Sequence, residues 1–212
     1  MQYAVIPVTP FQQNCTVLWQ PQSLRGAIID PGGDLPRIER FLSDKGIELE
    51  KILLTHGHLD HAGAAAELAE HHGVPVEGPH LGDKFWLDMI PQQAQMFGFT
   101  GRAVLPDRWL AQGDEVTVGG ETLEVRHCPG HTPGHVIFFH RADQIAQVGD
   151  VLFAGSIGRT DFPGGNHAQL LTSIREQLWP LGDEVTFIPG HGPRSTLGHE
   201  RRHNPFVAAN YR

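Results

Sequence analysis

The chain has 212 residues, 40% of them hydrophobic, which is enough for one large domain or two small ones with a substantial core. Its net charge of -8 at pH 7 argues against nucleic acid as the main partner, because phosphate binding requires a basic surface. The two cysteines exclude a disulfide framework, and no apolar run reaches the roughly 18 residues of a membrane span.

The amino-terminal segment MQYAVIPVTP has no basic stretch leading into an apolar run, so we expect no signal peptide. Low cysteine usage is typical of a reducing compartment. These two features together predict a cytoplasmic protein with no membrane partner.

In the first half of the chain, strands are expected where short apolar runs are bounded by turn residues. The expected strands are YAVIPV (3–8), CTVLW (15–19), GAIID (26–30) and KILL (51–54). Apolar periodicity predicts helices at 34–45 and 61–72, the second stopped by Gly73. Residues 80–113 predict a short helix near 82–89 within a long irregular connection.

In the second half, four strands are expected in close succession, at 115–118, 122–127, 135–140 and 144–149. A helix at 167–178, a strand at 185–189 and a short helix at 196–203 follow. Strand clusters separated by helices indicate sheets with helices packed outside them. No repeat or linker interrupts the pattern, so we expect a single domain over residues 1–212.

The stretch THGHLDH (55–61) places three histidines and one aspartate in seven positions. In an extended loop, residues two apart point to the same side, so His56 and His58 can approach one ion together. Asp60 and His61 begin the following helix and lie within reach of a second ion. The alternative is that Asp60 caps this helix and the histidines face solvent. A chance frequency of roughly a few in a thousand favours the metal site.

Other candidate ligands also follow apolar strands. His131 and His135 lie in PGHTPGH, Asp150 follows QIAQVG, and His191 follows VTFIPG. Loops at the carboxyl ends of strands converge in layered α/β proteins, so these side chains are expected to meet.

The series THGHLDH, PGHTPGH, GD (149–150) and PGHGP (189–193) resembles the metallo-β-lactamase-fold hydrolases. Within them it resembles the glyoxalase II (hydroxyacylglutathione hydrolase) branch, especially its short bacterial members, which share GRTDFPGG (158–165) and PGHGPRST. The resemblance covers nearly the whole chain and implies an α/β fold, a four-layer αββα sandwich with the metals at one edge.

The resemblance also implies a ligand set. His56, His58 and His131 match the first metal site, Asp60, His61 and His191 match the second, and Asp150 matches the bridging carboxylate. The implied cofactors are two zinc ions, with iron or manganese also compatible. His135 has no place in this set, and we expect it to support a ligand.

The implied activity is thioester hydrolysis, of S-lactoylglutathione or a related hydroxyacyl thioester, by a metal-bound hydroxide. The catalytic residues would be Asp60, which orients the nucleophile, and Asp150. A thiol has a pKa of about 8.5, so it can leave without a strong general acid. Arg159 either pairs with Asp161 or meets a substrate carboxylate. The expected partner is a small molecule, and the sequence allows a monomer without fixing the oligomeric state.

Two alternatives stay open. GRTDF and HTPGH also resemble the persulfide dioxygenases, which use one iron. A non-catalytic zinc-binding protein is the other, although structural zinc sites are closed with four ligands. Full-length glyoxalase II enzymes hold glutathione with a basic carboxyl-terminal extension. This chain ends soon after His191, so weak binding of glutathione is expected.

Overall fold

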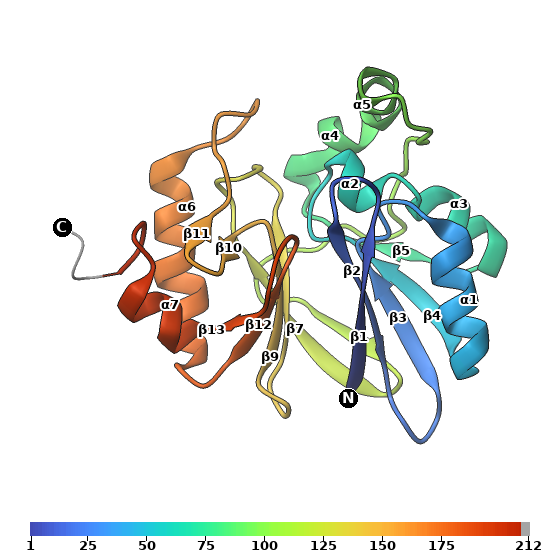
Figure 1. The fold of residues 1–212 in the computed structure, drawn as a ribbon, viewed down its shortest axis with the longest axis horizontal. Coiled ribbons are helices and arrows are strands. Elements are labelled where there is room, and N and C mark those ends of the chain that lie inside the picture. Colours follow the sequence, from blue (N-terminus) through green and yellow to red (C-terminus); the bar gives the residue numbers. More distant parts are fainter. Residues whose placement is uncertain (209–212) are drawn as a thin grey trace.

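Two β-sheets pack face to face in the computed structural model, which describes residues 1–208, and helices cover their outer sides (Figure 1). The first sheet has the strand order β1-β2-β3-β4-β5 and the second β13-β12-β9-β8-β7-β6. Helices α1 and α3 lie outside the first sheet, and α6 and α7 outside the second (Figure 1). The predicted four-layer αββα sandwich is confirmed.

The first half of the chain forms the first sheet and its helices. Its elements are β1 (Gln2–Val8), β2 (Gln13–Trp19), β3 (Arg25–Ile29), α1 (Leu35–Lys45), β4 (Glu48–Leu53), α2 (Leu59–Ala62), α3 (Ala65–His72), β5 (Val76–Glu77), the 3₁₀ turn η1 (Leu81–Asp83), α4 (Lys84–Asp88) and α5 (Ile90–Phe97).

The second half forms the second sheet. Its elements are β6 (Glu115–Val118), β7 (Glu121–His127), β8 (Val136–His140), β9 (Ile145–Gly149), β10 (Leu152–Phe153), β11 (Ser156–Ile157), α6 (His167–Ser173), η2 (Ile174–Leu178), η3 (Trp179–Leu181), β12 (Thr186–Pro189), β13 (Ser195–Thr196) and α7 (Leu197–His203).

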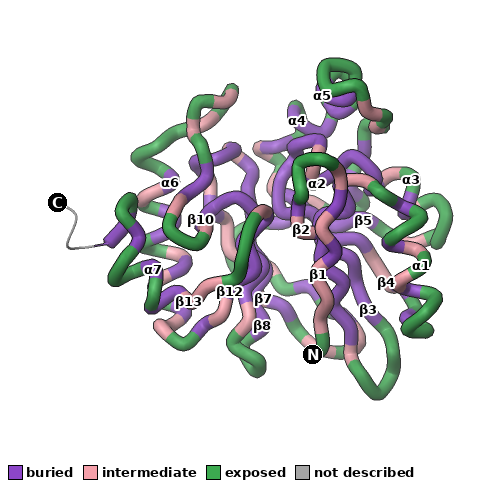
Figure 2. The backbone as a smooth tube through the Cα atoms, viewed as in Figure 1, coloured by how far each residue is buried: buried purple, intermediate pink, exposed green. Residues whose placement is uncertain are grey.

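Strand residues alternate between two cores, as the period of a β-strand requires. On β3, Ala27 and Ile29 pack between the two sheets, whereas Ile28 packs toward the helices. On β8, Phe138 packs between the sheets and Phe139 packs toward α6. Both faces of the central strands are therefore buried, and exposure is concentrated in the outer loops (Figure 2).

The predicted helix over 61–72 is wrong in one respect, because the chain breaks it into α2 and α3 at Gly63 and Ala64. The Ala64 N–H donates to the carbonyl of Pro31 instead of continuing the helix. A Cβ on Gly63 would lie 2.8 Å from the carbonyl oxygen of Gly32. Tertiary contact with the 31–33 turn therefore overrides the helical preference of this alanine-rich segment.

The long connection predicted over 80–113 contains more helix than expected. The short helix near 82–89 is confirmed as η1 and α4, but α5 follows it directly. Pro91 in the first turn and Gly98 as the carboxyl-terminal cap were the available signals for α5. Among the described residues, no helix has both the length and the apolar character needed to cross a bilayer.

Candidate metal centre

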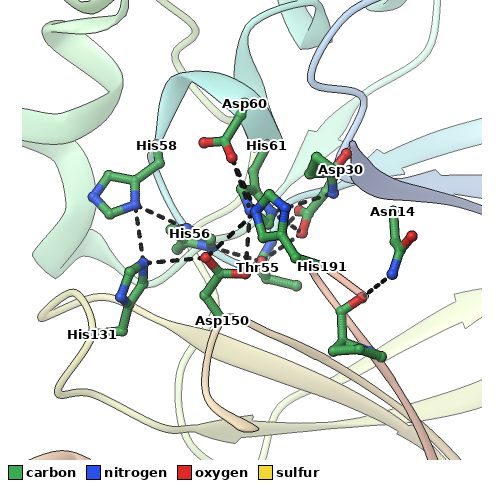
Figure 3. A network of polar contacts seen from close by, with 12 residues as sticks. Asn14, Asp30, Thr55, His56, His58, Asp60, His61, His131, Asp150 and His191 are labelled. Atoms are coloured by element: carbon green, nitrogen blue, oxygen red, sulfur yellow. Dashed lines mark hydrogen bonds and ion pairs between the residues drawn. The ribbon is translucent and has the colours of Figure 1, made fainter. Parts of the chain in front are cut away.

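The seven candidate ligands lie past the ends of central strands, where the loops of the two sheets meet (Figure 3). His56 and His58 follow β4, Asp150 follows β9, and His191 follows β12. His131 lies in the connection between β7 and β8. Strand β4 runs parallel to β3, and β12 parallel to β9, so the loops after these strands can converge at one edge.

The first group consists of three imidazoles. Nδ1 of His58 lies 3.1 Å from Nε2 of His56 and 3.1 Å from Nε2 of His131. Zinc binds imidazole nitrogen at about 2.0–2.1 Å, so two ligand atoms of a tetrahedral site lie about 3.3 Å apart. The three nitrogens thus have the spacing of ligands around one ion.

The second group combines one carboxylate with two imidazoles. Oδ2 of Asp60 lies 3.1 Å from Nε2 of His191 and 3.8 Å from Nε2 of His61. These three atoms also lie close enough together to hold one ion. His191 and Asp60 are the more exposed members, so this group faces the opening of the site.

Asp150 lies between the two groups (Figure 3). Its Oδ1 is 3.4 Å from Nε2 of His61, and its Oδ2 is 3.6 Å from Nε2 of His131 and 3.8 Å from Nε2 of His191. One carboxylate therefore borders both groups, as a bridging ligand must.

The imidazoles of the first group are neutral. The pKa of His58 is lowered to about 3, mainly by burial and also by the neighbouring His131, although the carboxylates of Asp60 and Asp150 act in the opposite direction. Burial likewise lowers the pKa of His56 and of His131. Neutral imidazole is the form that binds metal, so these nitrogens need lose no proton first.

Asp150 and the second group carry the charge. Burial raises the pKa of Asp150, but His61, His131 and His191 outweigh it and hold the pKa well below its usual range. Burial lowers the pKa of His61, but the carboxylates of Asp150 and Asp60 outweigh it and keep the pKa well above its usual value. The carboxylates are therefore ionised and available as ligands.

These residues fit divalent metal ions. Nε2 of His61 and Oδ1 of Asp150 are buried and make no hydrogen bond within the described part of the chain, although they face each other. Buried polar atoms without a partner are rare in folded proteins. An ion between two such atoms would satisfy both, and imidazole nitrogen with carboxylate oxygen is a donor set that zinc accepts.

Two of the histidines are oriented by backbone carbonyls. Nδ1 of His131 donates to the carbonyl oxygen of Arg159 at 2.7 Å, and Nδ1 of His191 donates to that of Phe11 at 3.2 Å. Each bond fixes the orientation of the ring, so Nε2 points into the site. Metal-binding histidines usually have such an outer partner.

Asp30 orients two other histidines, His61 directly and His56 through Thr55. Its Oδ2 accepts from Nδ1 of His61 at 2.8 Å and from the hydroxyl of Thr55 at 2.6 Å. Because that hydroxyl donates to Asp30, its oxygen can accept from Nδ1 of His56, 3.0 Å away. Asp30 is saturated with donors, which favours a supporting role over that of a ligand.

His135 lies outside both groups, as expected. It is fully buried, and its Nε2 accepts from the backbone N–H of Asp150 at 3.0 Å. Its ring stacks on that of His56 at 4.6 Å. The expected supporting role is thus matched by contacts with two candidate ligands.

Arg159 pairs with Asp161, which is one of the two roles expected from the sequence. Nε and the terminal nitrogen of the guanidinium donate to the two carboxylate oxygens at 2.7 and 2.6 Å. The guanidinium also lies 4.2 Å from the ring centroid of Phe162, which in turn packs at 5.0 Å against His58. The pair is exposed, and it borders the first group.

Two supporting residues were not anticipated. Asn14, at the start of β2, donates its side-chain amide to the carbonyls of Pro189 and Gly192 on either side of His191. Asp83 accepts hydrogen bonds from the loops of the first group. Neither lies in a histidine-rich motif, and the only signal was that each is a polar residue next to an apolar run.

Comparison with known proteins agrees with this geometry. A model described as the metallo-beta-lactamase superfamily matches residues 8–191. The hydroxyacylglutathione hydrolase GloC of Haemophilus influenzae is 47% identical over 98% of this chain and 98% of its own. The BLEG-1 B3 metallo-beta-lactamase structure has a TM-score of 0.90 at 36% identity, covering 97% of this chain and 99% of its own. The structure of TTHA1623 in a di-iron-bound form has a TM-score of 0.87 at 35% identity, covering 96% and 100%.

The likeness extends over nearly the full length of these relatives. It confirms the predicted resemblance and the prediction of a metal-dependent hydrolase. The chain belongs to the metallo-beta-lactamase superfamily, in which its nearly full-length match to a hydroxyacylglutathione hydrolase places it with the glyoxalase II-like members.

Proposed function

We propose that this protein hydrolyses thioesters, with S-lactoylglutathione or a related hydroxyacyl thioester as substrate. The observation that carries the proposal is the position of Asp150 between two donor groups, each with the spacing of ligands around one ion. The 47% identical relative named as a hydroxyacylglutathione hydrolase supports this substrate class.

The seven residues would hold two divalent ions. We propose zinc at both positions, because neutral imidazole and carboxylate suit it; the relative solved with two irons makes iron the alternative occupant. When bound, such ions activate water at neutral pH and polarise a substrate carbonyl. The proposed ligands are His56, His58 and His131 in the first group and Asp60, His61 and His191 in the second. Asp150 is proposed as a ligand to both ions.

Asp60 is proposed to orient the attacking water. Burial raises the pKa of this carboxyl, but the nearby His61 and His191 outweigh it, so the pKa is lowered and the group is ionised. Only one of its oxygens lies near the imidazole of His191. The partly exposed carboxylate can therefore accept a hydrogen bond from water on the side open to substrate.

Aromatic side chains are proposed to flank the reacting group. Trp86 packs against His58 at 4.5 Å between ring centroids, and Phe162 packs against the same ring at 5.0 Å. Phe11, whose carbonyl accepts from His191, packs edge-on against Phe97 at 5.3 Å. These apolar side chains would shield the bound acyl group from water, while the departing thiol needs no strong acid.

Metal analysis combined with turnover tests the proposal. Two zinc ions per chain and hydrolysis of S-lactoylglutathione by the zinc-loaded protein are the expected results. One iron per chain, with oxygen consumption on glutathione persulfide and no thioester hydrolysis, would instead identify a persulfide dioxygenase. Tightly bound zinc with neither activity would indicate a binding protein.

A further inference from the structure

The buried carboxylate of Asp83 connects the two loops that carry the first group of histidines. It lies at the end of η1 with none of its surface exposed. Its Oδ2 accepts from the backbone N–H of Gly57 at 2.9 Å and from the hydroxyl of Thr132 at 2.7 Å. Its Oδ1 accepts from the backbone N–H of Gly134 at 2.5 Å.

Two of these three donors sit directly beside candidate ligands, and the third, Gly134, lies in the loop that carries His131. Gly57 is the residue between His56 and His58, and Thr132 follows His131. A single side chain from a separate segment therefore holds the backbone next to all three imidazoles. Displacing either loop would change the 3.1 Å distance between His58 and His131, which lie on different loops.

Close packing leaves little freedom around this carboxylate. A Cβ on Gly134 would lie 2.3 Å from the backbone nitrogen of Asp83, and a Cβ on Gly57 would lie 2.6 Å from Cβ of Trp86. Both loops are thus pressed directly onto the segment that contains Asp83. The backbone N–H of His80 also donates to the carbonyl of Gly134 at 3.0 Å, which fixes the same loop from a second point.

We propose that Asp83 is a positioning residue that sets the spacing of His56, His58 and His131 and thereby the affinity of the first ion site. The inference rests on the proposed function in one respect, namely that these histidines hold an ion. It also explains why a carboxylate is needed. An asparagine has one acceptor oxygen, so its amide nitrogen would face an N–H or hydroxyl donor that Asp83 accepts from.

Zinc affinity in two complementary backgrounds tests the proposal. His191→Ala disables the second group and leaves the first, whereas His58→Ala disables the first and leaves the second. Adding Asp83→Asn should lower the affinity for zinc 10- to 100-fold in the His191→Ala background, the usual range for a lost outer partner. In the His58→Ala background the affinity should change less than twofold. Competition with a chelator gives both values.

Glu200 offers a matched control. It is also a buried carboxylate with three donors, namely the Gly155 N–H, the Ser195 hydroxyl and the Asn204 amide, but it supports α7 and the β10–β11 hairpin. Glu200→Gln in the His191→Ala background should leave zinc affinity unchanged. If it lowers the affinity as much as Asp83→Asn does, general destabilisation explains both and the proposal is wrong.

Thr132→Val is a milder variant that removes only one of the three hydrogen bonds. It should weaken zinc binding in the same selective way, by less than Asp83→Asn, and it carries the test if the latter does not fold. Equal losses in both backgrounds, or no loss in the His191→Ala background, would overturn the positioning role. Failure of the His191→Ala protein itself to bind zinc would overturn the first ion site, and with it this inference.

Discussion

The ring of His135 accepts a hydrogen bond from the backbone of Asp150, with 3.0 Å between Nε2 and the amide nitrogen. Burial lowers the pKa of His135 well below its usual value, and the surrounding histidines lower it further. The ring is therefore neutral, with its proton on Nδ1 and its lone pair on Nε2. It can hold the loop of Asp150 in place without competing for an ion.

Two replacements of His135 test whether the hydrogen-bond acceptor or the imidazole ring matters. Glutamine can place an oxygen near the position of Nε2, so His135→Gln should lower kcat/KM by 10- to 100-fold and retain both ions. His135→Leu has no acceptor and should lose more activity. Kinetics and metal content of the two variants, measured side by side, check this. Loss of one full metal equivalent in His135→Gln would mean that His135 is itself a ligand.

Asp150→Ala should abolish turnover and reduce metal content at both positions, because the carboxylate borders both groups. The comparison that isolates the bridge is His191→Ala, which should reduce binding at the second position only. Metal stoichiometry after dialysis against a weak chelator distinguishes the two patterns. Near-normal metal loading in Asp150→Ala would remove this residue from the site.

The strands could be predicted because most are apolar on both faces. Val136 to Phe139 form a short, fully buried run that includes β-branched and aromatic residues, which is typical of a strand between two layers. The break at Gly63 could not be predicted, since it depends on contact with the distant backbone of Gly32. The short strand β5 was missed for a related reason, because it depends on pairing with β4 and on a bridge from Glu77 to Arg108.

The candidate ligands could be identified from the motifs, whereas the residues that position them could not. His56, His58 and Asp60 are close in sequence and share one motif. Asp83 is a single aspartate between Gly82 and Lys84, and nothing local distinguishes it from a solvated carboxylate. Its role comes from donors 26 and 51 residues away along the chain.

Gly190 has a steric role beside the second group. A Cβ at this position would lie 2.0 Å from Oδ1 of Asp150 and 2.6 Å from Cε1 of His61. Gly190→Ala should therefore displace the carboxylate and reduce metal content and turnover by at least tenfold. Gly192→Ala is the control, because its Cβ would meet nothing within 4 Å, although its φ of +78° costs about 1 kcal/mol of strain. Equal metal loss in both variants would contradict the steric explanation.

Stability should depend on pH through Asp83. Burial raises the pKa of its carboxyl from 3.8 to about 6, and hydrogen bonds from Thr132, Gly57 and Gly134 offset part of this rise. A raised pKa in the folded state means that the folded protein binds the proton more tightly. The stabilisation from this group is therefore complete below pH 3.8 and is lost as the pH rises through about 6.

The measurement compares the metal-free protein with Asp83→Asn, which cannot titrate at this position. Between pH 4 and pH 7, the free energy of unfolding of the parent protein should fall by about 2 kcal/mol relative to that of the variant, at about 1.36 kcal/mol per pKa unit. Urea unfolding at several pH values gives this difference. If the difference in unfolding free energy stays constant with pH, or changes in the opposite direction, the pKa of the Asp83 carboxyl is not raised.

The last prediction concerns Arg159 and the charge of the substrate. Its exposed ion pair with Asp161 competes with any carboxylate that the substrate brings, and exposed pairs contribute little stability. Asp161→Asn should free the guanidinium, which Phe162 holds beside the first group. The KM for S-lactoylglutathione, which carries carboxylates, should then fall several-fold with kcat unchanged.

An uncharged thioester separates this effect from a change in the shape of the loop. Its KM should be the same in the parent protein and in Asp161→Asn, because it offers no carboxylate to the guanidinium. Adding Arg159→Gln should cancel the gain for the glutathione thioester, and the gain should shrink as salt screens the exposed charges. Equal effects on both thioesters, or a gain that survives Arg159→Gln, would assign Arg159 to loop structure alone.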